Sequence, residues 1–296
     1  MIEVPASFRE MPRWWSEGTA WLDALPMLAD AQCERWSLRP DGSPRHGSNA
    51  MVLPVRRGQQ RLGLRLTPPG DELASTIAAL RFWSGRGTVE LVAADADHGA
   101  LLLEWLDADR SLASLPPAEA FPIIGRTIRR LAVPAPAGVR STGEEAIEEA
   151  DSWRRRWSDL GEPLSAPLLD SALGCTRALA EPTTPDLAVD ANLHFEQVLA
   201  GFREPWLVVD PVLLRGDIGY DLGRILWSRL DELGNDAAVR HWLDILVEAA
   251  ELDRDRARRW VVTRATSYLF WGLEQGLTED PPRCLRLLHL FADRPT

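Results

Sequence analysis

The 296-residue chain contains no lysine, and all 33 of its basic residues are arginine. This absence excludes a P-loop lysine, a Schiff-base lysine that would hold pyridoxal phosphate, and the strand lysine with which kinases grip the phosphates of ATP. A phosphate grip in this chain must therefore use arginine, whose planar fork is not equivalent to an ammonium group.

Cysteine and long apolar runs are also scarce. Cys33, Cys175 and Cys284 lie far apart without metal-binding spacing, which predicts buried free thiols in a reducing cytoplasm. Neither a signal-peptide pattern nor an apolar run of about 18 residues occurs, so no membrane association is expected. The net charge of −11 argues against a nucleic-acid partner and favours a cationic small-molecule ligand.

The first 106 residues predict a small lobe of helix and antiparallel sheet. The first 30 residues have the aromatic spacing of a helix, and a second helix is expected over Asp71–Ser84. Apolar runs bounded by turn residues predict a five-stranded sheet around this inserted helix. The expected strands are Glu34–Leu38, Ala50–Val55, Arg61–Leu66, Thr88–Ala93 and Ala100–Trp105.

Residues 107–296 have a mainly helical pattern, interrupted by a loop region at 190–221 that contains a short hairpin, Gln197–Leu199 with Trp206–Val209. The whole chain therefore predicts an α+β fold with a sheet lobe (1–106) and a helical lobe (107–296). The expected helices of the second lobe are Pro116–Leu131, Glu144–Leu160, Leu164–Leu179, Leu222–Leu233, Ala237–Ala250, Arg254–Leu273 and Pro282–Phe291.

Three phrases in the loop region carry a family resemblance. They are Asp-Ala-Asn-Leu-His-Phe-Glu-Gln-Val-Leu (190–199), Trp-Leu-Val-Val-Asp-Pro (206–211) and Gly-Asp-Ile-Gly-Tyr-Asp-Leu-Gly (216–223). This pattern resembles the catalytic and metal-binding core of the aminoglycoside phosphotransferases, most closely the streptomycin 6-kinase and hydroxyurea phosphotransferase branch. Phrases at 85–91, 99–104 and 203–207 extend the resemblance over nearly the full chain. It implies a bilobal protein-kinase-like fold.

The resemblance places the family's catalytic aspartate at Asn192. An amide does not accept a proton at physiological pH, and loss of a general base typically costs about 10²–10⁴ in rate. Asp190, at the family's histidine position, is the candidate substitute carboxylate, which its two-residue offset allows only in a rearranged loop, and His194 matches the family in a loop-supporting role.

The resemblance also implies a site for ATP and Mg²⁺. Asp210 stands at a metal-ligand position and Gln197 replaces the family's metal-binding asparagine. Arg65 stands at the position of the ATP-gripping lysine. The family's partner glutamate falls on Thr76, with Glu72 one turn earlier as its substitute.

The strand end at Glu104, Trp105 and Leu106 completes the expected nucleotide contacts. Two of the nucleotide-site residues also have a structural alternative. Asp210 is alternatively a loop cap, and Arg65 is alternatively an arginine on the surface of a strand. Asp217 and Asp221 match the family's Gly-Asp-x-x-Tyr-Asp and are expected to cap the next helix and fix the catalytic loop.

Two function classes follow. The first is an ATP-dependent kinase of a small-molecule hydroxyl, such as that of an antibiotic or secondary metabolite. The alternative is a pseudokinase-like relative that binds a small molecule or supports a partner enzyme, motivated by Asn192, Gln197, Arg65 and Thr76. A third class, other chemistry in the same cleft, has no nucleophile–base pair to support it.

Overall fold

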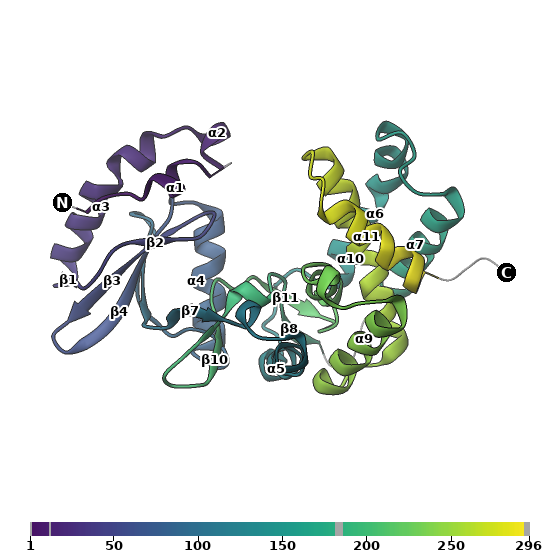
Figure 1. Cartoon of the computed structure of the whole chain (residues 1–296). Coiled ribbons are helices and arrows are strands. Elements are labelled where there is room, and N and C mark those ends of the chain that lie inside the picture. The colour runs from purple at the N-terminus through teal and green to yellow at the C-terminus, as the bar shows by residue number, and fades with distance from the viewer. Residues whose placement is uncertain (1, 12, 181–185, 293–296) are drawn as a thin grey trace. The chain divides into compact units, whose positions relative to one another are not determined.

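The computed structural model describes residues 2–11, 13–180 and 186–292 (Figure 1). The chain forms two compact units. Unit 1 comprises Met1–Asp109 and Leu199–Asp210, and unit 2 comprises Arg110–Val198 and Pro211–Thr296. The sequence predicts a boundary after residue 106, but it does not predict that the segment 199–210 returns to the first unit.

Unit 1 contains an antiparallel sheet with helices packed on it. Its main sheet has six strands in the order β1-β3-β4-β6-β5, with β2 paired to β3. The helices are α1 (Ala6–Arg9), α2 (Arg13–Glu17), α3 (Ala20–Arg35) and α4 (Asp71–Trp83). The strands are β1 (Arg39–Pro40), β2 (Arg45–His46), β3 (Met51–Arg57), β4 (Gln60–Leu66), β5 (Leu91–Asp95) and β6 (Ala100–Glu104).

The predicted strand Glu34–Leu38 is wrong. Helix α3 continues to Arg35 because Leu22, Leu25, Ala29 and Cys33 are buried at helical spacing. The sheet then begins with the two-residue strand β1. The single helix expected over the first 30 residues is also wrong, since three helices precede the sheet.

Alternating side chains on the sheet divide unit 1 into two apolar clusters. Leu62 and Leu64 of β4 pack in a cluster with Leu22 and Leu25 of α3. Leu101 and Leu103 of β6 pack in the other cluster with residues of α4. Because strand side chains alternate between faces, Arg65 lies on the α4 side of the sheet. Figure 1 shows α4 running beside these strands.

A smaller sheet has the order β10-β9-β7, formed by β7 (Asp107–Ser111), β9 (Val198–Ala200) and β10 (Trp206–Val208). The pairing of β9 with β10 confirms the hairpin predicted around residues 197–209.

Unit 2 is built around α10 (Arg254–Glu274), whose buried residues cover most of its circumference. It packs against α6, α7, α8 and α11. The other elements are α5 (Pro117–Leu131), α6 (Thr142–Asp159), α7 (Ala166–Leu179), α8 (Leu222–Trp227), α9 (Asp236–Ala250), α11 (Asp280–Phe291), the antiparallel pair β8 (Leu187–Asp190) and β11 (Leu213–Gly216), and the short 3₁₀ helices Leu112–Ser114, Phe195–Gln197 and Leu230–Glu232.

The helix predicted over Leu222–Leu233 is too long. Helix α8 ends at Trp227, and Arg229 leaves helical geometry with φ −130° and ψ 18°. Cys33, Cys175 and Cys284 are buried thiols that form no disulfide, as predicted. Among the described residues, we find no helix with the length and apolar character needed to span a bilayer.

Two helical glycines give a stability prediction. A Cβ at Gly125 of α5 would lie 2.6 Å from Cβ of Ala249, whereas a Cβ at Gly174 of α7 would meet nothing within 4 Å. We expect Gly125→Ala to lower the free energy of unfolding by about 1–3 kcal/mol through overpacking. Its matched control, Gly174→Ala, should raise it by about 0.5–1 kcal/mol through helix propensity. Thermal unfolding of both variants measures this difference, and equal shifts would contradict the close approach of α5 and α9.

Candidate functional site

In unit 1, the predicted phosphate-gripping cation and the predicted metal ligand form an ion pair. Nη2 of Arg65 donates to Oδ1 of Asp210 at 2.9 Å, and the two side chains are 11% and 27% exposed. The hydroxyl of Thr76 lies 3.4 Å from the same carboxylate oxygen. Asp210 has a left-handed backbone with φ 55°, a conformation that costs most residues energy and clusters at functional sites.

The other predicted nucleotide contacts in unit 1 have partners of their own. The carboxylate of Glu72 pairs with Arg13 at 3.3 Å, and Glu104 pairs with Arg203 at 2.9 Å. Arg203 also donates to the carbonyl oxygens of Gly85 and Thr88. This arginine thus ties the β9–β10 hairpin to the strand end at Glu104.

The end of β6 is followed by an aromatic residue and a buried aliphatic one. The guanidinium of Arg61 lies 4.1 Å from the ring centroid of Trp105, within the range of a cation–π interaction. Leu106 is buried in the α4-side cluster. The proposed nucleotide role of these residues stays a prediction.

In unit 2, two aspartates fix the catalytic-type loop. Oδ1 of Asp190 accepts from the backbone N–H groups of Asn192 at 3.0 Å and Val212 at 2.9 Å. Oδ2 of Asp221 accepts from the backbone N–H of Leu193 at 2.9 Å. This confirms the prediction that Asp221 fixes the loop. The predicted capping role is wrong for Asp221, which occupies the N-cap of α8 but makes no side-chain cap hydrogen bond.

Asp217, the other residue of this motif, accepts from Gly219 N at 2.9 Å and pairs with Nε of Arg256 at 2.7 Å. Its side chain therefore closes the turn before α8 and joins that turn to α10. Both roles are structural.

Burial shifts the pKa values of the two aspartates that hold the loop. It raises the pKa of Asp190 to about 7, opposed by the hydrogen bond from Val212 and reinforced by the charge of Asp221. Burial also raises the pKa of Asp221, opposed by Arg264, whose guanidinium lies 3.7 Å from its carboxylate. Oδ2 of Asp190 is buried with no hydrogen-bond partner among the described residues. Asp190 therefore anchors the loop backbone from a buried position, and its catalytic role stays a prediction.

Asn192, at the family's base position, is oriented by an arginine that sequence reasoning missed. Nη1 of Arg224, on α8, donates to Oδ1 of Asn192 at 2.8 Å. The sequence spacing could have indicated this residue. Arg224 follows Asp221 by three residues and so falls on the same side of α8.

His194 and Gln197 complete the loop. Burial lowers the pKa of His194 to about 3, and Arg224 adds to this effect, so the imidazole is neutral at physiological pH. The backbone oxygen of His194 accepts from the backbone N–H of Gln197 at 3.0 Å, which opens the 3₁₀ turn Phe195–Gln197.

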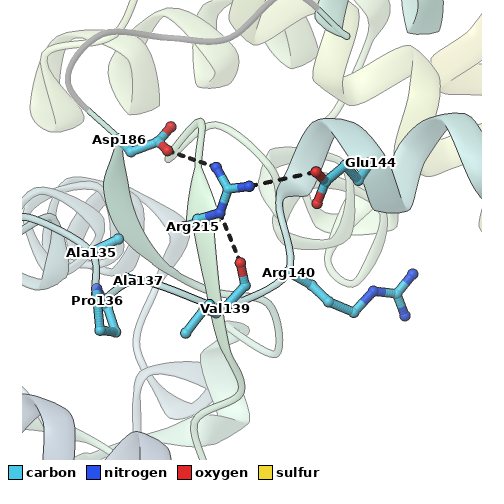
Figure 2. Close-up of a pocket in the computed structure, with 9 residues that line it drawn as sticks. Ala135, Pro136, Ala137, Val139, Arg140, Glu144, Asp186 and Arg215 are labelled. Carbon is cyan, nitrogen blue, oxygen red and sulfur yellow. Dashed lines mark hydrogen bonds and ion pairs between the residues drawn. The ribbon is translucent and has the colours of Figure 1, made fainter.

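A separate pocket of about 550 Å³ in unit 2 contains none of the predicted site residues. In Figure 2, Arg215 projects between Asp186 and Glu144, with Nη1 2.7 Å from Asp186 and Nη2 3.5 Å from Glu144. Its Nε donates to the carbonyl oxygen of Val139 at 2.8 Å. Groups of the chain itself therefore occupy the hydrogen-bond donors of Arg215, which supports a structural role for this arginine.

The described residues contain no group of three or more His, Cys, Asp or Glu side chains placed to hold a metal ion. The predicted metal ligands are therefore Asp210 and the amide of Gln197, and oxygen atoms of a bound phosphate would add to them. The donor chemistry fits Mg²⁺, which is typically bound through one or two carboxylates and substrate phosphates.

Sequence comparisons with known proteins indicate one family. The sequence profile described as "Aminoglycoside/hydroxyurea antibiotic resistance kinase" matches residues 35–276. The chain is 37% identical to streptomycin 6-kinase of Streptomyces griseus, over 93% of this chain and 92% of that one. It is also 37% identical to hydroxyurea phosphotransferase of Kitasatospora aureofaciens, over 99% and 87% of the two chains.

Among solved structures, the fold is similar to a thermostable mutant of aminoglycoside phosphotransferase APH(4)-Ia in a ternary complex with ADP and hygromycin B. The TM-score is 0.63 at 14% identity, over 89% of this chain and 98% of that one. The predicted α+β kinase-like fold is thereby confirmed. The relatives carry kinase names, which gives no support to the pseudokinase alternative.

Proposed function

The chain belongs to the aminoglycoside/hydroxyurea antibiotic resistance kinases, and on that premise we propose that it transfers the γ-phosphoryl group of ATP to a hydroxyl group of a small molecule. The acceptor classes suggested by its relatives are an aminoglycoside such as streptomycin and an N-hydroxy compound such as hydroxyurea.

The ion pair of Arg65 with Asp210 is the observation that carries this proposal. A guanidinium binds phosphate through its planar fork, and a carboxylate is a hard ligand suited to Mg²⁺. In the structure each group neutralises the other, as a phosphate and a cation would in the nucleotide complex. Bound Mg²⁺ supplies charge neutralisation of the phosphates during transfer. A metal-binding role for Gln197 remains part of the proposal.

The loop of unit 2 supports the acceptor side of the proposal. Asp190 and Asp221 hold its backbone through three hydrogen bonds from Asn192, Val212 and Leu193. Rigid placement matters for phosphoryl transfer, because catalysis consists mainly of positioning and charge stabilisation. The loop thus keeps Asn192 in a fixed place without a carboxylate at that position.

Calorimetric titration with Mg-ATP tests the nucleotide half of the proposal. We expect wild type to bind and Arg65→Met to bind about 10- to 100-fold more weakly, since a charge-assisted hydrogen bond contributes about 1.5–3 kcal/mol. The matched control is Arg56→Met, which removes an exposed arginine of β3 that pairs with Asp41 and should change the Kd less than about twofold. Equal Kd values for wild type and Arg65→Met would contradict the assigned phosphate contact.

A further inference from the structure

A charged cluster lies behind the loop in unit 2, where α10 passes close to α8. A Cβ at Gly223 of α8 would lie 2.9 Å from Cβ of Arg264 on α10, so the glycine lets the two helices approach closely. The guanidinium of Arg264 lies 4.2 Å from the ring centroid of Tyr220. Its Nη2 lies 3.7 Å from Oδ1 of Asp221, and its Nη1 lies 3.9 Å from Oε1 of Glu149 on α6. Arg264 thus places a cation beside the aspartate that holds the loop.

The contacts of Arg264 with the two carboxylates are electrostatic. A hydrogen bond from nitrogen to oxygen is about 2.7–3.2 Å long, and both distances exceed that range. Nε of Arg264 and Oδ1 of Asp221 are buried with no hydrogen-bond partner among the described residues. Because Coulomb attraction acts over this separation and is strong at a poorly solvated site, Arg264 affects Asp221 by charge more than by bond geometry.

The charge of Asp221 depends on its neighbours. The residue is 3% exposed, and burial raises the pKa of its carboxyl. The charge of Arg264 is the first influence that lowers this pKa, followed by the charge of Arg224 and the hydrogen bond from Leu193. An ionised carboxylate accepts a hydrogen bond more strongly than a neutral one. The hold of Asp221 on the N–H of Leu193 therefore depends on the cations beside it.

We propose that Arg264 is a positioning residue of the transfer reaction, whose positive charge stabilises the ionised form of Asp221, the form that fixes the catalytic-type loop through Leu193. The kinetic consequence of this inference rests on the phosphotransferase function proposed above, and its structural consequence does not. Oδ2 of Asp221 accepts from the backbone N–H of Leu193 at 2.9 Å. Leu193 directly follows Asn192, the family's base position, so a displacement of this backbone displaces position 192. Small displacements are costly in a reaction that depends on alignment.

Amide hydrogen exchange at Leu193 tests the structural link. We expect Arg264→Met to speed exchange of this amide about 10-fold or more, because its acceptor loses a stabilising charge. Arg264→Lys should keep the wild-type rate within about threefold, since a lysine supplies the same charge without the guanidinium fork. The control Arg259→Met removes another arginine of α10, paired with Asp255 at 2.5 Å, and should leave the rate at Leu193 unchanged. Unchanged exchange in Arg264→Met would overturn the link.

The pH dependence of stability separates charge from packing. Arg264→Met should raise the native pKa of Asp221 further, so its native state binds protons that the wild type has released. The variant then loses stability relative to wild type as the pH rises. We expect the fall in Tm caused by Arg264→Met to be larger at pH 7.5 than at pH 4 by about 4 °C or more. A loss through packing alone would be equal at both pH values and would overturn the inference.

The variant Asp221→Asn isolates this aspartate from the other groups near the cluster. The remaining charged or titratable groups that influence Arg264, Asp221 or Asp190 are Tyr220, Arg224, Glu145 and Glu149.

Asparagine at position 221 keeps an oxygen for the N–H of Leu193 and removes the charge. At pH 7.5, Arg264→Met should lower Tm less in the Asp221→Asn background than in wild type, by about 4 °C or more. An unfolded Arg264→Met whose combination with Asp221→Asn folds would support the same dependence. Equal falls in both backgrounds, or a combined variant that is also unfolded, would overturn it.

Steady-state transfer from Mg-ATP tests the kinetic consequence, with streptomycin and hydroxyurea as acceptor probes. Arg264→Met should lower kcat about 10²-fold, and Arg264→Lys should restore most of the rate. The Kd for Mg-ATP should stay within about twofold of wild type, because Arg65 and Asp210 are unchanged. Full activity of Arg264→Met would overturn the positioning role. If wild type transfers to neither probe, the proposed function and this kinetic consequence fail together, whereas the exchange and Tm measurements decide the structural link.

Discussion

The Asp190→Asn variant should gain stability relative to wild type as the pH rises from about 4 to about 7.5. In the folded protein, burial raises the pKa of Asp190 to about 7, whereas the unfolded chain titrates near about 3.9. Between these values the unfolded state has lost the proton and the native state keeps it. The wild type therefore loses stability as the pH rises through this window, and asparagine removes that loss.

The size of this stability difference follows from the pKa shift of Asp190. A displacement from the ordinary value of 3.8 to about 7 corresponds to about 4 kcal/mol at 1.36 kcal/mol per pH unit. Asparagine at this position keeps an oxygen for the N–H groups of Asn192 and Val212. Its NH₂ group replaces the buried unpaired Oδ2.

Urea unfolding of wild type and variant at pH 4, 5, 6, 7 and 7.5 measures this difference. The control Asp170→Asn changes a carboxylate that is 59% exposed and paired with Arg154, and its difference from wild type should stay nearly constant above about pH 5. A difference for Asp190→Asn that stays constant, or falls, across the same range would contradict a raised pKa of Asp190 in the folded protein.

The second large effect concerns Asp210. We expect Asp210→Asn to reduce phosphoryl transfer by about 10³-fold, because the metal contributes several kcal/mol of charge stabilisation in the transition state. Asparagine tolerates the left-handed backbone, φ 55° at this position, so the variant should fold. It removes only the charge that Asp210 offers to a cation and to Arg65.

Steady-state ADP release with saturating Mg-ATP and acceptor measures this loss. Asp41→Asn is the control in the same unit, since Asp41 pairs with the exposed Arg56 and Arg61 of the sheet. It should keep the wild-type rate. Full activity of Asp210→Asn would remove the basis for a metal ligand at this position.

The sequence assigns roles to site residues but does not predict their contacts. The family resemblance places Arg65 at the position of the ATP-gripping lysine and Asp210 at a metal-ligand position. Their ion pair, however, joins residues 145 positions apart, and neither local pattern contains that information. The substitute partner predicted for Arg65 on α4 is Glu72, yet that carboxylate pairs with Arg13 of α2.

Arg224 is a second residue whose contact the sequence does not predict. The motif around Asp221 predicts roles only for its acidic residues, and an arginine on an amphipathic helix is ordinarily a surface residue. Only the loop geometry brings its guanidinium to Asn192. The wrong prediction of a strand at Glu34–Leu38 has a simpler cause. A short apolar run fits helix and strand alike, and burial of Cys33 in the α3 core decides for helix.

Transfer of the labelled γ-phosphoryl group of ATP to an acceptor is the most direct measurement of the proposed function. Wild-type protein is incubated with Mg²⁺, γ-labelled ATP and hydroxyurea, with streptomycin in a parallel reaction. We expect label on hydroxyurea with wild type and a near loss of that label with Asp210→Asn. If both acceptors stay unlabelled and calorimetry detects no Mg-ATP binding by the wild type, the protein is not the phosphotransferase proposed here.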